Sequence, residues 1–203
     1  MHVKVCGVTR LEDAEACVRA GVDAVGINLV PASPRCVSRD VARRIADALR
    51  GRVQVVLVTA DLELAELRAL HAEVGCDRLQ LHGHETPALV AALQPLAFKA
   101  VRIGDPHDVE AAAAFVGSPL LVDARHGAML GGTGHRVDVT LVAPLGRRRP
   151  LLLAGGLGPE NVAEAIAAVR PWGVDTASGV ESAPGIKDHA RLAAFVAAAR
   201  GAG

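Results

Sequence analysis

The sequence predicts an α/β protein with one domain, a single (β/α)8 TIM barrel that spans residues 1–203. Two observations lead to this prediction. Eight short apolar runs alternate with Ala-, Leu- and Arg-rich helical segments, and no linker, low-complexity tract or block of charge interrupts them. Strict alternation indicates parallel strands joined by right-handed crossovers. Eight such units close into a barrel, and 203 residues lies near the lower limit of about 200 for that fold.

The expected strands are short runs rich in β-branched and other apolar residues. A doubly wound open sheet could use the same strands, but it more often carries a GxGxxG or P-loop turn after the first one, and VCGVTR is neither. The barrel is therefore preferred. In chain order the strands are Val3–Cys6, Asp23–Asn28, Val53–Val58, Arg78–His82, Phe98–Ile103, Leu120–Asp123, Leu151–Ala154 and Gly173–Thr176.

The expected helices show 3.6-residue periodicity or capping signals. Within Leu11–Ala20, the apolar residues Leu11, Ala14, Cys17 and Val18 share one face. Ser38 can cap the first turn of Ser38–Leu49, and Pro159 suits the first position of Pro159–Val169. The other helices are Leu62–Val74, Pro87–Leu93, His107–Phe115, a weaker one near Val137–Ala143, and Ala190–Arg200.

Composition excludes several classes of protein. The chain is 51% hydrophobic and carries 22 Lys+Arg against 22 Asp+Glu, which argues against disorder. With no surplus of positive charge and only 2% aromatic residues, it has little with which to bind nucleic acid. It has no apolar run near the roughly 18 residues of a membrane helix, and its first residues do not resemble a secretory signal. Four cysteines without a CxxC pair favour free thiols and a cytoplasmic location.

Polar side chains end several of the expected strands, at the edge where barrels place their chemistry. Cys6 ends the first strand, and Asp123 ends the sixth. Gln80 and His82 share a face of the fourth strand, and Asp175 lies in the eighth. Local alternatives remain open: Cys6 as a small buried residue, Asp123 as the start of a turn, and Lys4 with Asp175 as a buried structural pair.

A metal site is not expected. His82 and His84 form an HxH pair, but zinc needs further ligands and no other strand end supplies a histidine.

Three late loops predict a phosphate site. They read LGGTGHR, AGGLGPEN and ASGVESAPGIKD and follow the sixth, seventh and eighth strands. Glycines let backbone N–H groups approach an anion, and barrels often bind phosphate with the loops after strands seven and eight. The candidate phosphate-binding residues are Gly132, Gly134, Gly155, Gly156, Ser178 and Gly179.

Six motifs, in order and at matching spacing, resemble the phosphoribosylanthranilate isomerase family over nearly the whole chain. They are VKVCGVTRLEDA, DAVGINLVPASPRCVS, LQLHGHETP, LLVDA followed by GGTG, LLLAGGLGPENVAEAI and GVDTASGVESAPGIKD. The resemblance implies an isomerase of tryptophan biosynthesis that needs no cofactor. Its reaction is the Amadori rearrangement of N-(5-phosphoribosyl)anthranilate, a small phosphorylated substrate, and the protein would be a monomer or homodimer.

The resemblance also implies residue roles. The general base falls on Cys6 and the general acid on Asp123. The residue that faces the anthranilate carboxylate falls on Arg35, and a substrate-side histidine falls on His82. Gln80, which shares the face of His82, and Asp175, whose role is less defined, complete the expected substrate-binding set.

The chain departs from the family pattern at three places, none of which removes a catalytic group. Ile27-Asn28-Leu29 and Val137-Asp138-Val139 stand where aromatic residues are common, and Cys36 replaces a frequent aromatic residue beside Arg35. A looser pocket and a relaxed substrate range are therefore expected.

Three other functions fit the sequence less well. A related or bifunctional histidine-pathway isomerase would have Asp at the end of the first strand, so Cys6 argues against it. A non-catalytic phosphosugar-binding barrel would have no need of both Cys6 and Asp123. A metal-dependent hydrolase would need more ligands than the HxH pair.

Overall fold

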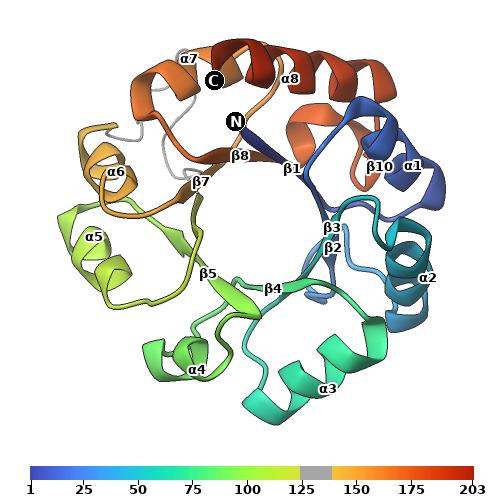
Figure 1. The fold of residues 1–203 in the computed structure, drawn as a ribbon, viewed down its shortest axis with the longest axis horizontal. Coiled ribbons are helices and arrows are strands. Elements are labelled where there is room, and N and C mark those ends of the chain that lie inside the picture. Colours follow the sequence, from blue (N-terminus) through green and yellow to red (C-terminus); the bar gives the residue numbers. More distant parts are fainter. Residues whose placement is uncertain (124–138) are drawn as a thin grey trace.

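The computed structural model describes residues 1–123 and 139–203, which form a closed parallel barrel surrounded by helices (Figure 1). Its strands follow one another around the ring from β1 to β8, so the predicted fold class is confirmed. Lys4 of β1 lies in register with Asp175 of β8 and helps close the ring. The strands are β1 His2–Cys6, β2 Ala24–Asn28, β3 Gln54–Thr59, β4 Arg78–Leu81, β5 Ala97–Arg102, β6 Leu120–Asp123, β7 Leu151–Ala154 and β8 Gly173–Thr176.

One helix follows each strand and packs on the outside of the barrel (Figure 1). The connection from β8 to the last helix also holds a short 3-10 helix, η1 (Ser178–Val180), and a two-stranded ribbon of β9 (Glu181–Ala183) and β10 (Ile186–Lys187), which were not predicted. The helices are α1 Leu11–Ala20, α2 Arg39–Leu49, α3 Leu64–Val74, α4 Pro87–Ala92, α5 Pro106–Ala113, α6 Val139–Gly146, α7 Val162–Val169 and α8 His189–Ala202.

Two capping predictions have opposite outcomes. The Ser38 hydroxyl accepts a hydrogen bond from the N–H of Val41, as predicted for the start of α2. The predicted start of α7 at Pro159 is wrong, because the side chain of Asn161 closes a turn ahead of the helix. Its Oδ1 accepts from Gly158 N at 2.8 Å and its Nδ2 donates to Gly156 O at 3.1 Å. Pro159 therefore belongs to the loop after β7.

The buried face of α1 also differs from the prediction. Leu11 is 47% exposed, whereas Asp13 is fully buried. Both carboxylate oxygens of Asp13 are satisfied: Arg10 donates two hydrogen bonds of 2.9 Å, and His189 Nε2 lies 2.8 Å away. Because its oxygens are hydrogen-bonded, a carboxylate can lie on the buried face of α1, although the apolar periodicity places that face elsewhere on the helix.

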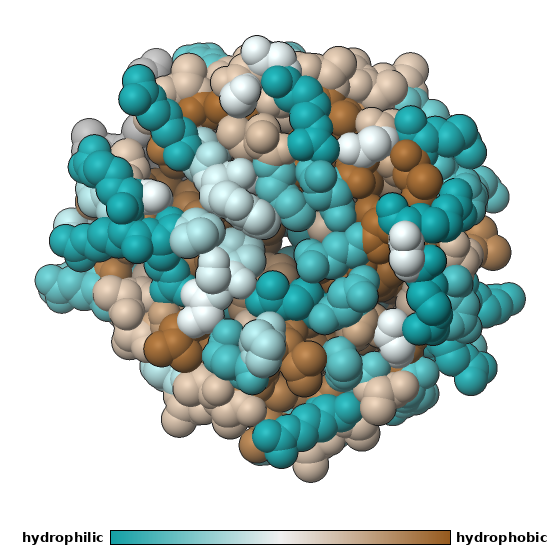
Figure 2. Space-filling model, in the orientation of Figure 1, coloured by the Kyte–Doolittle hydropathy of each residue, from teal (hydrophilic) through white to brown (hydrophobic). Residues whose placement is uncertain are grey.

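The core has two parts. Most buried Val, Leu and Ile side chains lie between the strands and the surrounding helices. A smaller cluster fills the inside of the barrel and consists of Ala24, Val56, Phe98, Ala100, Leu121, Leu152 and Ala154. Figure 2, in the same view down the barrel, shows hydrophilic side chains gathered around the centre of the ring. None of the helices in the described ranges is both long enough and apolar enough to cross a membrane.

Candidate active site

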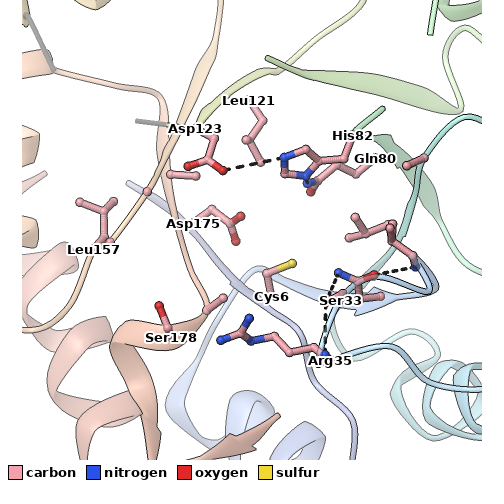
Figure 3. Close-up of a pocket in the computed structure, with 18 of the residues that line it drawn as sticks. Cys6, Ser33, Arg35, Gln80, His82, Leu121, Asp123, Leu157, Asp175 and Ser178 are labelled. Atoms are coloured by element: carbon pink, nitrogen blue, oxygen red, sulfur yellow. Dashed lines mark hydrogen bonds and ion pairs between the residues drawn. The ribbon is translucent and has the colours of Figure 1, made fainter. Parts of the chain in front are cut away.

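A cavity of about 340 Å³ lies at the carboxyl ends of the strands (Figure 3). It brings together residues from the first, fourth, sixth and eighth strands and from the loops after β2, β7 and β8. Gly132 and Gly134 lie outside the described residues. The predicted site residues that line the cavity are Cys6, Arg35, Gln80, His82, Asp123, Gly155, Gly156, Asp175, Ser178 and Gly179.

Cys6 ends β1 with its sulfur directed into the cavity (Figure 3). Gly26 on the neighbouring strand makes room for it: a Cβ there would lie 2.8 Å from Cys6 Sγ and 3.1 Å from Lys4 Nζ. Desolvation raises the pKa of the Cys6 thiol, while the positive charges of Lys4 and Lys187 act in the opposite direction. Cys6 is therefore largely a neutral thiol at pH 7 and needs substrate or a local cation to favour the thiolate.

Asp123 faces His82 across the cavity (Figure 3). Its Oδ2 lies 3.8 Å from His82 Nε2, and its buried Oδ1 has no hydrogen-bond partner among the described residues. An unpartnered buried oxygen of this kind is rare outside functional sites. It leaves Asp123 free to donate or accept a proton at the cavity.

Gln80 lies behind His82 rather than at the centre of the site. Its Nε2 is 3.1 Å from Nδ1 of the imidazole, so that Nδ1 accepts and the proton of neutral His82 lies on Nε2, toward Asp123. Burial lowers the pKa of His82 and thereby outweighs the attraction of Asp123. His82 is therefore a neutral hydrogen-bond donor at pH 7.

Lys4 and Asp175 form the buried pair that the strand pattern allowed. Lys4 Nζ donates to Asp175 Oδ1 at 2.9 Å, and the lysine is 1% exposed. Burial alone would lower the pKa of Lys4, but the negative charge of Asp175, with a smaller contribution from Cys6, raises it overall. The pair holds a cation beneath Cys6 and also leaves Asp175 on the cavity wall.

Arg35 reaches the cavity from the loop after β2, and its charge is paired with a residue that the sequence analysis missed. Its Nε and Nη2 donate to the two oxygens of Glu181 at 2.8 and 2.6 Å. The aliphatic part of Arg35 crosses Gly7, where a Cβ would overlap Arg35 Cδ. No local pattern predicts the pair, because 146 positions separate the partners. The one signal was the place of Glu181 directly after the glycine-containing turn that follows β8.

The loops after β7 and β8 form the opposite wall of the cavity. Gly155 and Gly156 have φ of 105° and 66°, values that favour glycine. A Cβ on Gly179 would overlap the carbonyl oxygen of Leu157, so glycine is required where the two loops meet. Within residues 1–123 and 139–203, the backbone N–H groups of Gly155, Gly156, Ser178 and Gly179 donate to no carbonyl. They remain available to an anion.

A metal centre finds no support in the described part of the chain. None of its His, Cys, Asp and Glu residues form a group of three or more that could hold a metal ion. The side chain of His84 is 97% exposed and lies 3.3 Å from Asp61, so it does not join His82 at the cavity.

Comparisons with known proteins agree in pointing to one family. The family model described as "N-(5'phosphoribosyl)anthranilate (PRA) isomerase" matches residues 3–198. The N-(5'-phosphoribosyl)anthranilate isomerase of Pseudomonas fluorescens (strain Pf0-1) is 44% identical over 199 residues, which cover 97% of each chain. The crystal structure of the Thermotoga maritima phosphoribosyl anthranilate isomerase superposes with a TM-score of 0.89 at 40% identity, covering 99% of both chains.

A further solved isomerase is relevant because it holds a ligand. It is a phosphoribosyl anthranilate isomerase in complex with reduced 1-(o-carboxyphenylamino)-1-deoxyribulose 5-phosphate. It superposes with a TM-score of 0.87 at 39% identity and covers 99% of both chains.

Proposed function

Because the chain belongs to the N-(5'-phosphoribosyl)anthranilate isomerase family, we propose that its cavity rearranges N-(5'-phosphoribosyl)anthranilate to 1-(2-carboxyphenylamino)-1-deoxyribulose 5-phosphate. It is an isomerase of tryptophan biosynthesis, and the histidine-pathway alternative is not favoured. The observation that carries the residue assignment is that Cys6, Asp123 and the glycine loops line one cavity.

Asp123 is the general acid of the proposed reaction. It protonates the furanose ring oxygen, so that the ring C–O bond breaks and a protonated imine forms between the anthranilate nitrogen and C1′. The unpartnered Oδ1 supports this role because no other group of the described residues competes for it. His82 carries its proton on Nε2, close to the other oxygen of Asp123. Because the imidazole is neutral, it can donate a hydrogen bond to the carboxylate that forms when Asp123 gives up its proton.

Cys6 is the proposed general base. Its thiolate removes the proton from C2′ and leaves an enolamine. This intermediate then gains a proton at C1′ and loses the hydroxyl proton, so that C2′ becomes a ketone. Ring opening breaks one C–O bond within the substrate and the later steps transfer protons, so substrate and product have the same composition. Lys4, Lys187 and the Arg35 side chain surround Cys6 with positive charge, which supports formation of the thiolate. Each acid–base step contributes about 10²–10⁴-fold to the rate.

The two anionic groups of the substrate are assigned to opposite walls of the cavity. The phosphate fits the N–H groups of Gly155, Gly156, Ser178 and Gly179. The anthranilate carboxylate fits Arg35, which can form two parallel hydrogen bonds to it. Gln80 orients His82 through its contact with Nδ1, and Asp175 orients Lys4 through their buried ion pair.

We also propose that residues 1–203 form a single domain, because the closed ring takes strands from both ends of the chain. The proposed partners are limited to a small phosphorylated substrate, with the protein as a monomer or a homodimer. The cytoplasmic location and the lack of a nucleic-acid partner stay predictions from composition.

Complementation tests the proposed function most directly. Expression of the chain should restore growth without tryptophan to a strain that lacks this isomerase. It should not restore growth to a strain that lacks the corresponding histidine-pathway isomerase. Growth of the second strain alone would overturn the proposal, and growth of both would show a bifunctional enzyme.

A further inference from the structure

Arg35, Glu181 and Lys187 form a connected, mostly buried ion cluster beside Cys6. The exposed fractions of their side chains are 14%, 4% and 0%. We propose that Glu181 and Lys187 are positioning residues that present one edge of the Arg35 guanidinium to the carboxylate of the substrate. This inference rests on the proposed function and assigns roles to two residues outside the expected acid–base set.

The geometry fixes which edge of Arg35 remains available. The guanidinium has five N–H donors in a rigid plane. Glu181 takes one from Nε and one from Nη2. Both donors on Nη1 and the second donor on Nη2 remain, and they form the end of the side chain. Arg35 lines the cavity, and Figure 3 shows its guanidinium on the same side as Cys6. Glu181 thus leaves the end-on edge free for a second carboxylate.

Lys187 prevents Glu181 from moving away. Its ammonium donates to Glu181 Oε1 at 2.8 Å, to the Cys6 carbonyl at 2.6 Å and to the Ala177 carbonyl at 3.2 Å. One buried cation therefore connects the end of β1, the turn after β8 and the carboxylate that holds Arg35. All three N–H donors of Lys187 are used in these contacts. Glu181 is therefore held in place and does not occupy the position that the substrate carboxylate would take.

Lys187 also sets the charge of the cluster. Glu181 alone would neutralise Arg35 and weaken its attraction for an anionic substrate. With two cations and one carboxylate, the cluster keeps a net positive charge at the cavity wall. The same charge lies close enough to lower the pKa of Cys6 against the larger effect of burial. Glu181 thus orients Arg35, and Lys187 supplies the charge that Glu181 would otherwise cancel.

The experiment compares two ligands on two proteins. The ligands are reduced 1-(o-carboxyphenylamino)-1-deoxyribulose 5-phosphate and its counterpart without the carboxylate, and Kd is measured by calorimetry for the wild type and for Glu181→Gln. The wild type should prefer the carboxylated ligand. Glu181→Gln should lose about tenfold or more of that preference, the cost of one misaligned charge-assisted contact. The counterpart without the carboxylate should bind both proteins equally.

A double-mutant cycle with Arg35→Ala isolates the route of the effect. If Glu181 acts through Arg35, adding Glu181→Gln to Arg35→Ala should cause no further loss of preference. Losses that add in full would overturn the proposal, as would an unchanged ligand preference in Glu181→Gln. Glu73→Gln is the matched control, because Glu73 forms an exposed pair with Arg39 on the outer helices and should leave both Kd values unchanged.

Two further measurements keep the test decisive. Should Glu181→Gln fail to fold, Arg35→Lys replaces it, since a lysine cannot serve Glu181 and the substrate as a planar fork does. Arg35→Lys should then lose the same preference for the carboxylated ligand, and retained preference would overturn the proposal. Turnover by the wild type is measured in parallel. An inactive wild type contradicts the proposed function, whereas an active wild type with an indifferent Glu181→Gln contradicts only the positioning role.

Discussion

Asp123 Oδ2 lies 3.8 Å from His82 Nε2, while Asp123 Oδ1 is buried without a partner among the described residues. The two oxygens of one carboxyl group therefore have different environments. One oxygen is near a neutral imidazole that can donate a hydrogen bond, and the other is open to whatever occupies the cavity. This asymmetry suits a group that must give up a proton on one side while its charge is stabilised on the other.

Replacing Asp123 with Asn should lower kcat by at least about a hundredfold, because the amide keeps the shape but cannot transfer the proton. The ligand that carries both phosphate and carboxylate should still bind within a fewfold of the wild-type Kd. Steady-state kinetics and calorimetry on the same preparation check this. Turnover close to that of the wild type would remove Asp123 from the mechanism.

Cys6 should react with iodoacetamide more slowly at neutral pH than an ordinary thiol, and its rate should keep rising above pH 9. Burial raises the pKa of Cys6, so a smaller fraction is thiolate at any given pH. Mass spectrometry of a Cys36→Ser variant isolates the reaction, because burial raises the pKa of Cys17 and Cys76 to about 12. A midpoint below the ordinary pKa of a thiol would contradict the burial argument.

Cys6→Ala should lower kcat by about a hundredfold or more.

Gly26→Ala should damage both stability and turnover, although Gly26 transfers no proton. The added Cβ would lie 2.8 Å from the Cys6 sulfur and 3.1 Å from Lys4 Nζ, so one of these groups must move. Overpacking of this kind costs about 1–3 kcal/mol in the free energy of unfolding. Urea unfolding and kcat measure the two effects. Gly201→Ala in α8, where a Cβ meets nothing within 4 Å, is the control and should be neutral or slightly stabilising.

Asp13→Ala should destabilise the fold by about 1–3 kcal/mol, because it removes the charge-assisted hydrogen bonds between a buried carboxylate and the partly exposed Arg10 and His189. Burial alone would raise the pKa of Asp13, but hydrogen bonds from Arg10 and His189 lower it overall. A carboxyl group whose pKa is lowered in the folded state stabilises the fold at pH values above its unfolded-state pKa of about 3.9.

Asp13 therefore also predicts a pH dependence. Its contribution should be lost as pH falls below about 3.9 and through the lowered folded-state pKa. Urea unfolding at pH 7 and at pH 3 should show a smaller difference between Asp13→Ala and the wild type at the lower pH. Asp40→Asn, which removes an exposed pair with Arg43, is the control and should change stability by less than about 1 kcal/mol. An equal loss in the two variants would contradict the role of burial.

Sequence periodicity was sufficient for the barrel because each strand is a local apolar run and each crossover obeys the same handedness. Cys6, His82 and Asp123 could be brought together without coordinates, since the carboxyl ends of all strands in a barrel meet at one mouth. Pro159 was misplaced because the Asn161 side chain competes with the helix for backbone groups, a balance that propensity does not resolve.

Long-range ion pairs were the main part of the site that could not be predicted. Glu181 and Lys187 lie in an irregular ribbon whose course depends on packing against β1 and the loop after β2. A second buried pair, Lys99–Glu85, is 3.0 Å long and joins residues that are closer in the sequence, and both of its members hydrogen-bond to Gly83 in the turn after His82. In the sequence, Glu181 resembles an ordinary solvent-exposed residue, because no local pattern marks a side chain whose partner, Arg35, lies 146 positions away.

The Lys4–Asp175 contact joins the first strand of the barrel to its last strand. A nascent chain therefore contains Cys6 and Lys4 long before Asp175, Glu181 and Lys187 have been synthesised, and the proposed site is complete only once the last barrel strand and the ribbon after it have docked. Truncated products are expected to be chemically inert as well as poorly packed. Gly203 also lies against Met1, so residues far apart in the sequence pack together near the closure of the ring.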